Sequence, residues 1–121
     1  MRPVTVLLRT PPHLASLAFR VEGGLDISRI EELDSLVAPA LRRDGVQVFV
    51  DIEAVTFMDS SGLGWLLRTQ NELTLRNGSL RVVGGSGGVL SRLLALTGLE
   101  DQIDIYPVVP NDAEQSRAAQ A

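Results

Sequence analysis

The feature that most constrains this fold is the alternation of short apolar strands with amphipathic helices along most of the chain. Strands are predicted at residues 4–8, 14–21, 46–52, 80–83 and 103–106, and helices at about 28–44, 61–76 and 89–96. Such alternation indicates parallel crossovers in which helices cover the sheet. We therefore predict an α/β fold with a mixed, mostly parallel sheet that is opened by an N-terminal antiparallel hairpin and covered by helices.

Glycines and capping residues mark the ends of several of these elements. Gly23 and Gly24 are predicted to break the chain after the hairpin. Asp26 or Ser28 then caps the first helix, because a short polar side chain can accept the unpaired N–H groups of a first turn. Residues 55–58 form a short apolar approach to a polar turn.

The chain is predicted to be one domain without a targeting segment. Its 121 residues suffice for one core, which we place in residues 1–110, and the polar tail at 111–121 is expected to be functionally silent. The apolar run at the N-terminus ends at Arg9, too early for a signal peptide, and no run approaches the length of a membrane span. We expect a cytoplasmic protein that does not insert into membranes.

The composition excludes most enzymatic chemistry. All 11 basic side chains are arginine, and the chain has one histidine and no cysteine. Structural zinc sites, disulfides and lysine Schiff bases are therefore excluded. The net charge of −4 and the aromatic content of 4% are also unsuited to nucleic-acid binding. We expect no metal, no cofactor and no nucleic-acid partner.

One loop nevertheless matches a catalytic motif. Residues 84–88 fit G-x-S-x-G around Ser86, between a predicted strand and a predicted helix, as in a nucleophile elbow. A hydrolase of that type needs a histidine downstream of the serine, whereas His13 lies upstream. A plain strand-to-helix connection is the favoured interpretation, and a small serine hydrolase remains a rival that predicts labelling by a fluorophosphonate probe.

The segment at 56–64 has a clearer physical logic. A strand leads into a turn, and two serines then begin a helix, where unpaired N–H groups and the helix dipole favour an anion. A phosphate on Ser61 would be tolerated there, yet it would add nearly two negative charges beside Asp59 and repel a partner shaped for the hydroxyl. The alternative is that Asp59 and Ser60 are simply helix caps, contributing about 1 kcal/mol.

Three stretches of the chain resemble STAS domains of the anti-sigma factor antagonist type. Residues 57–64, F-M-D-S-S-G-L-G, look like the family signature, and residues 94–99, L-A-L-T-G-L, resemble its late L-x-x-T/S-G-L stretch. Residues 23–26, G-G-L-D, stand where the family has a G-E-L-D-like turn. Gly24 replaces the usual acid, which we expect to loosen this turn. The similarity extends over residues 4–107.

This resemblance implies a regulatory protein with no catalysis of its own. Unphosphorylated antagonists of the family bind an anti-sigma factor, usually a serine kinase, and thereby free the sigma factor. The kinase, which supplies the ATP, phosphorylates the second serine of D-S-S-G, here Ser61, and a phosphatase reverses the reaction. Asp26, Asp59, Ser60 and Gly62 would form the surroundings of the phosphosite. An alternative within the family is a STAS subunit of a lipid-transport or signalling assembly that is never phosphorylated.

A helical wheel suggests where the partner docks. At 100° per residue, the inward stripe consists of Leu63, Leu66, Leu67, Leu73 and Thr74. The opposite side carries Ser61, Trp65, Arg68 and Glu72. Because an exposed tryptophan beside an arginine is a typical interface anchor, we hypothesise that this side docks the anti-sigma factor. The alternative is that Trp65 folds over Leu75 or a neighbouring element.

Overall fold

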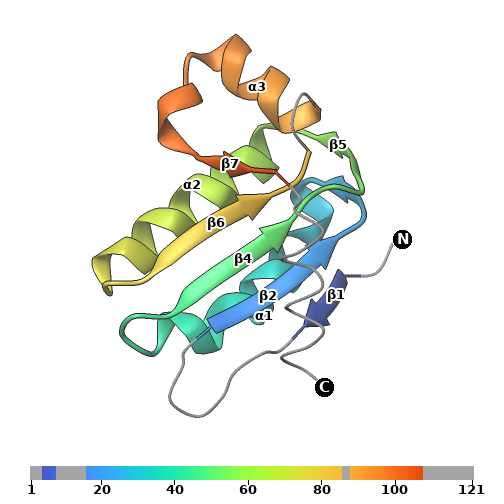
Figure 1. Ribbon diagram of the computed structural model, residues 1–121. Coiled ribbons are helices and arrows are strands. Elements are labelled where there is room, and N and C mark those ends of the chain that lie inside the picture. Colours follow the sequence, from blue (N-terminus) through green and yellow to red (C-terminus); the bar gives the residue numbers. More distant parts are fainter. Residues whose placement is uncertain (1–3, 8–15, 86–87, 108–121) are drawn as a thin grey trace.

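A five-stranded mixed sheet forms the centre of the molecule (Figure 1). The structure is a computed structural model, which describes residues 4–7, 16–85 and 88–107. In spatial order the strands are β1 (Val4–Leu7), β2 (Ser16–Val21), β4 (Gln47–Asp51), β6 (Ser79–Val83) and β7 (Ile105–Tyr106). The pair β1–β2 is antiparallel, and the three other pairs are parallel. The predicted mixed sheet with an antiparallel pair at its start is confirmed.

Two long helices cover one face of this sheet, and a third lies at its end (Figure 1). They are α1 (Ile30–Leu41), α2 (Ser60–Leu75) and α3 (Val89–Thr97). Short 3₁₀ segments precede α1 and follow α3, namely η1 (Ile27–Arg29) and η2 (Glu100–Gln102). Because α1 and α2 lie side by side on the same face, they contact each other as well as the strands beneath them.

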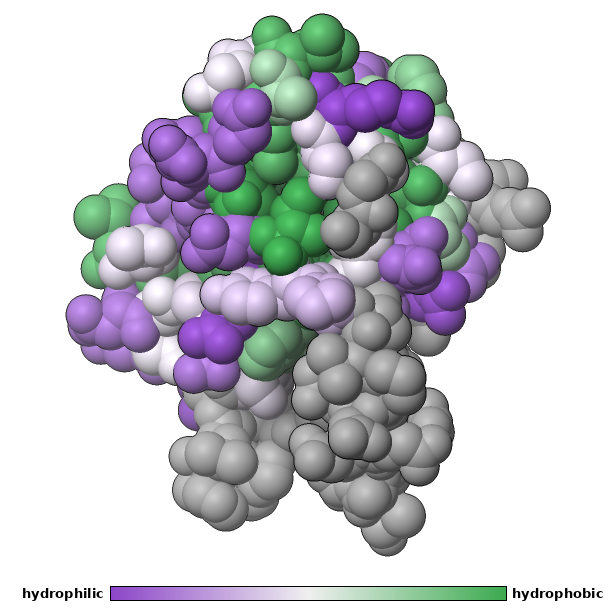
Figure 2. Space-filling view, turned by 45° about the horizontal axis from the view of Figure 1, so that its top comes forward, coloured by the Kyte–Doolittle hydropathy of each residue, from purple (hydrophilic) through white to green (hydrophobic). Residues whose placement is uncertain are grey.

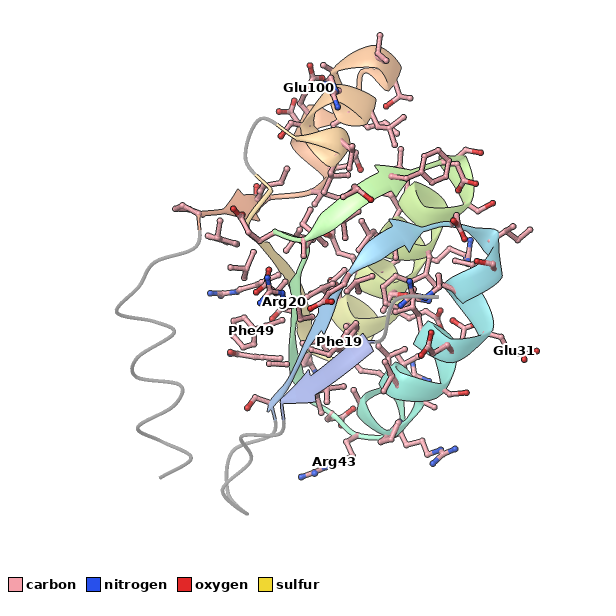
Figure 3. All side chains as sticks on the ribbon, turned by 90° about the vertical axis from the view of Figure 1, so that its right-hand side faces the viewer. Phe19, Arg20, Glu31, Arg43, Phe49 and Glu100 are labelled. Carbon is pink, nitrogen blue, oxygen red and sulfur yellow. The ribbon has the colours of Figure 1, made fainter. Side chains whose placement is uncertain are left out.

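The core lies between the sheet and these two helices. In the central strand β4, Val48 and Val50 are fully buried, as alternation along a strand with one covered face requires. Phe19 of the neighbouring strand β2 points toward the helices (Figure 3). Arg20 and Phe49 lie on the opposite face, which α1 and α2 leave uncovered (Figure 3). The apolar core is therefore one-sided.

A second, two-stranded parallel sheet was not predicted. It pairs β3 (Gly23–Leu25) with β5 (Val55–Met58), and Gly24 lies opposite Phe57. The prediction that Gly23 and Gly24 break the chain is wrong in that both residues belong to β3. The expectation that Gly24 loosens the turn stays a prediction. Gly23 has a positive φ of 82°, and the register with β5 shifts between the two glycines. Tertiary hydrogen bonds hold this irregular strand, including one from the N–H of Gly23 to the C=O of Ala54 (3.0 Å).

Three sequence predictions concern residues outside the described part of the chain: the turn containing His13, the serine at position 86 and the tail at 111–121. Within the described residues, no helix combines the length and the apolar character needed to cross a membrane.

Candidate functional site

The D-S-S-G motif forms the start of α2. Asp59 has an extended backbone, and its Oδ1 accepts hydrogen bonds from the N–H groups of Ser61 (2.9 Å) and Gly62 (3.1 Å). These are two of the N–H groups that a helix start leaves without a partner, so Asp59 caps the helix. Ser60 is the first residue of α2 and does not itself cap it. Of the two proposed caps, only Asp59 has that role.

The two serines differ in exposure. Ser60 is exposed, whereas Ser61 is half-buried. Both belong to the first turn of α2, at the end of the molecule where β5 and α3 also lie (Figure 1). The structure therefore presents both hydroxyls at one helix start, and burial alone does not select Ser61.

Gly62 brings the start of α2 into backbone contact with β3. A Cβ atom at Gly62 would lie 2.1 Å from the carbonyl oxygen and 2.9 Å from the carbonyl carbon of Leu25. Such distances leave no room for any side chain, because real Cβ atoms do not come within 3.0 Å of other heavy atoms. This close approach places Asp26, the residue after Leu25, beside the serine pair.

Asp26 caps η1 in the way that Asp59 caps α2. Its Oδ1 accepts hydrogen bonds from the N–H (2.9 Å) and the hydroxyl (2.6 Å) of Ser28. Of the two predicted caps, Asp26 is therefore the one used. The site thus contains two helix starts, each closed by a carboxylate, next to the serine pair. Each carboxylate places a negative charge at its own helix start.

Trp65 does not lie on an exposed face, so the wheel placed it wrongly. Its side chain is 0% exposed, and its Nε1–H donates a hydrogen bond to Oδ1 of Asp34 on α1 (2.8 Å). Its ring also meets the ring of Phe19 edge to face, with centroids 6.4 Å apart. The alternative that Trp65 folds over a neighbouring element is confirmed by these contacts, whereas packing over Leu75 is not, because Leu75 is 80% exposed. Trp65 joins α1, α2 and the sheet.

The physical reason is that α2 has two neighbours on its buried side. Of the predicted stripe, three residues are buried, Leu67 is half-buried and Thr74 is exposed, so the inward placement of Thr74 is wrong. Trp65, Thr69 and Leu73, at intervals of four residues, are all buried, and α2 contacts both α1 and β6. Sequence reasoning missed the burial of Thr69. The sequence did contain a signal for this burial. Trp65 and Thr69 lie eight and four residues before Leu73, which was already assigned to the core, so all three share one side of the helix.

Arg68 and Glu72 are exposed, as the wheel placed them. They lie about two and three turns beyond Ser61 along α2. Within the described residues, no ion pair joins Arg68 to Glu72. A role for either side chain in docking a partner stays a prediction.

Two exposed apolar side chains beside the serine pair were missed. Ile27, directly after Asp26, is 73% exposed, and Phe57, two residues before Asp59, is 52% exposed. The ring of Phe57 lies beside Gly24, with Cδ2 3.8 Å from where a Cβ of that glycine would be. Figure 2 shows that apolar and hydrophilic residues both reach the surface at the end of the molecule that carries α3. The available sequence signal was an apolar residue within two positions of each capping aspartate.

The arrangement offers a surface for recognition and lacks the groups for metal binding. Among the described residues, no three carboxylate, histidine or cysteine side chains gather closely enough to hold a metal ion. The chemical groups that the site does present are two serine hydroxyls, two carboxylates and two exposed apolar side chains. A nucleophilic hydroxyl at such a surface can receive a group from a partner.

Comparison with known proteins identifies the family. A model of the family described as STAS domain matches residues 6–111, and the chain belongs to this family. It is 34% identical over 87 residues to an anti-sigma-B factor antagonist of Staphylococcus aureus (strain NCTC 8325 / PS 47), covering 71% of this chain and 79% of that protein.

Solved structures show the same fold. The anti-sigma factor antagonist SpoIIAA in its unphosphorylated form superimposes with a TM-score of 0.70 at 21% identity, covering 98% of each chain. The Bacillus cell fate determinant SpoIIAA in the phosphorylated form gives a TM-score of 0.68 at 20% identity, covering 93% of this chain and 97% of that one. The predicted STAS-like α/β architecture is thereby confirmed.

Proposed function

We propose that this protein is an anti-sigma factor antagonist that binds an anti-sigma factor when unphosphorylated and is switched off by a phosphate on Ser61. The observation that carries the proposal is a serine pair at a capped helix start, flanked by exposed apolar side chains, in a chain 34% identical to an anti-sigma-B factor antagonist. The protein acts in the cytoplasm as substrate and binding partner and has no catalysis of its own.

The chemistry is performed on the protein by its partner. The anti-sigma factor, a serine kinase, supplies ATP, and the hydroxyl oxygen of Ser61 attacks the γ-phosphorus. The bond to the β,γ-bridging oxygen breaks, ADP leaves, and the hydroxyl proton is released. A phosphatase later hydrolyses the phosphate ester and restores the hydroxyl. No cofactor of the antagonist takes part in either step.

The geometry explains why a phosphate at this position would act as a switch. Oδ1 of Asp59 already accepts from the N–H groups of Ser61 and Gly62, so an added phosphate meets a carboxylate where free N–H donors would otherwise lie. The phosphate carries nearly two negative charges, and Asp26 adds another carboxylate nearby. This charge stays at the surface and repels a partner that fits the bare hydroxyl.

Incubation with ATP and the anti-sigma kinases of the same organism should add one phosphate, on the peptide that contains Ser61. The variant Ser61→Ala should lose this phosphate, while the matched variant Ser60→Ala, one residue away, should keep it. Tandem mass spectrometry assigns the position. We also expect Ser61→Asp to weaken binding of the anti-sigma factor at least about 10-fold, because like charges are then juxtaposed at the interface.

Each departure from this result has a definite meaning. Phosphate found only on Ser60 or another residue would overturn the site assignment. Undiminished binding by Ser61→Asp would contradict the switch. Binding without any phosphate transfer would favour the rival role as a non-phosphorylated STAS subunit, and fluorophosphonate labelling of Ser86 would favour the hydrolase.

The exposed apolar pair should contribute to the docking surface that was first assigned to Trp65. We expect Ile27→Ala and Phe57→Ala each to weaken binding of the anti-sigma factor by roughly 10-fold, or about 1.4 kcal/mol. Because both side chains are exposed, the free energy of unfolding should change by only about 0.5 kcal/mol. Isothermal titration calorimetry measures the first quantity, and urea unfolding the second.

Leu75→Ala is the matched control for this pair. Leu75 is 80% exposed but lies at the other end of α2, about 20 Å along the helix from the serines. The variant Leu75→Ala should leave the affinity for the anti-sigma factor unchanged. Equal losses for all three variants would show that the pair holds no special position in the interface.

A further inference from the structure

Arg29 is a buried cation whose hydrogen bonds point to a role beyond packing. It is the last residue of η1 and only 2% exposed. Burying a charge is costly unless its donors are satisfied. Among the residues that the structure describes, its one acidic partner is Glu32, whose Oε1 lies 3.1 Å from Nε and belongs to a half-exposed side chain. Its Nη2 has no hydrogen-bond partner among the described residues.

The guanidinium also holds the backbone of β3. Nη1 donates to the carbonyl oxygens of Glu22 (3.0 Å) and Gly24 (3.1 Å), one on each side of Gly23. A two-stranded sheet of this length is marginal on its own, and two glycines weaken it further. The side chain of Arg29 therefore fixes a strand that has little intrinsic tendency to form.

This strand leads directly to the residues that flank the serine pair. After Gly24 comes Leu25, which is fully buried and in backbone contact with Gly62, and then Asp26 and Ile27. The backbone N–H of Arg29 donates to the C=O of Asp26 (3.0 Å). Arg29 thus holds this segment at both ends, by its side chain at Gly24 and by its main chain at Asp26.

We propose that Arg29 is a positioning residue that fixes Asp26 and Ile27, defined here as the docking arm, where the anti-sigma factor meets the serine pair. The inference rests on the proposed function for the identity of that partner. An arginine suits this task because its planar fork directs several donors in fixed directions, which a single ammonium cannot do. Arg29 does not touch Ser61 or its cap, so it acts on binding and leaves phosphoryl transfer unaffected.

The variant Arg29→Lys tests the proposal because it keeps the charge and removes the fork. In the free protein, we expect amide hydrogen exchange in residues 23–28 to accelerate about 10-fold, as for the loss of one hydrogen bond to a charged group. Exchange in residues 63–73 of α2 should change less than about twofold, since this helix keeps its own packing. Mass spectrometry of peptic fragments resolves the two segments.

Phosphorylation by the kinase identified with wild-type protein gives the second readout. The KM for Arg29→Lys should rise about 10-fold while kcat stays within about twofold, because a misplaced arm weakens docking without moving the hydroxyl. A purely structural role would lower the folded fraction and leave the KM of the folded molecules unchanged. Two control variants should match wild type in both readouts. Glu32→Gln spares the contacts of Arg29 with the two carbonyl oxygens. Arg43→Lys changes an exposed arginine that lies beyond the far end of α1 (Figure 3).

Unchanged exchange in residues 23–28, or accelerated exchange with an unchanged KM, would overturn the proposal. Failure of wild-type protein to be phosphorylated at Ser61 is a separate result that refutes the proposed function. In that event the exchange data still decide whether Arg29 holds the arm. Should Arg29→Lys lower the folded fraction, native-state exchange at a lower temperature restores the comparison.

Discussion

Gly62→Ala should destabilise the protein by about 3 kcal/mol and strongly reduce binding of the anti-sigma factor. The added methyl group would lie 2.1 Å from the carbonyl oxygen of Leu25, so backbone must move. Forcing atoms into a packed region typically costs about 1–3 kcal/mol, and backbone contacts yield less readily than side chains. The movement separates α2 from β3 and displaces Asp26 from the serines. Urea unfolding followed by circular dichroism measures the stability.

Gly64→Ala is the control, because the same substitution two residues along meets no backbone. The nearest atom is Nη1 of Arg68 at 3.4 Å, the end of a flexible side chain. Alanine is favoured over glycine inside a helix by about 1 kcal/mol, so this variant should be as stable as wild type or more stable. Equal stability of the Gly62→Ala and Gly64→Ala variants would contradict the close approach of α2 to β3.

The parts of the fold that were predictable have strong periodicity. Residues 46–52 are rich in β-branched side chains, with Val46, Val48 and Val50 on one face, and the structure gives strand β4 there. The segment at 61–76 carries apolar residues at helical spacing, and α2 begins and ends within one residue of that range. In both segments the pattern arises because one face is buried, and this periodicity can be read from the sequence without the structure.

Strand β3 could not be predicted because its stability is not local. Gly23 and Gly24 have low strand propensity and no side chains to show an alternation. The strand exists because groups outside it hold it, namely the C=O of Ala54, the guanidinium of Arg29 and the backbone around Gly62. These contacts require the tertiary fold to be known.

In the candidate site, too, the parts that depend on local sequence could be predicted and the parts that depend on tertiary contacts could not. The position of Asp59 and the serines at a helix start followed from spacing, and the capping geometry agrees with it. The position of the docking arm, Asp26 and Ile27, depends on β3, which was not predicted. The exposed apolar side chain of Ile27 was therefore missed. Trp65 was misplaced because a helical wheel assumes one neighbour, whereas α2 packs against both the sheet and α1.

Trp65→Ala should lower the free energy of unfolding by about 3–5 kcal/mol, as expected for truncating a fully buried tryptophan. Trp65→Phe keeps an aromatic ring near Phe19 but loses the hydrogen bond to Asp34, and it should cost about 1–2 kcal/mol. Asp34→Ala removes the same bond from the other side and leaves Nε1–H of Trp65 buried without an acceptor, at a cost of about 1–3 kcal/mol. Guanidinium unfolding followed by circular dichroism measures all three variants.

The double variant Trp65→Phe with Asp34→Ala should cost less than the sum of the two single changes, because the same bond is removed in each. The affinity of the folded protein for the anti-sigma factor should stay within about twofold for Trp65→Phe, since the ring is buried and cannot touch a partner. Phe57→Ala should show the opposite pattern, with affinity lost and stability kept. If Trp65→Phe instead weakened binding while leaving stability unchanged, the interface would contain Trp65 and its burial between α1 and α2 would be refuted.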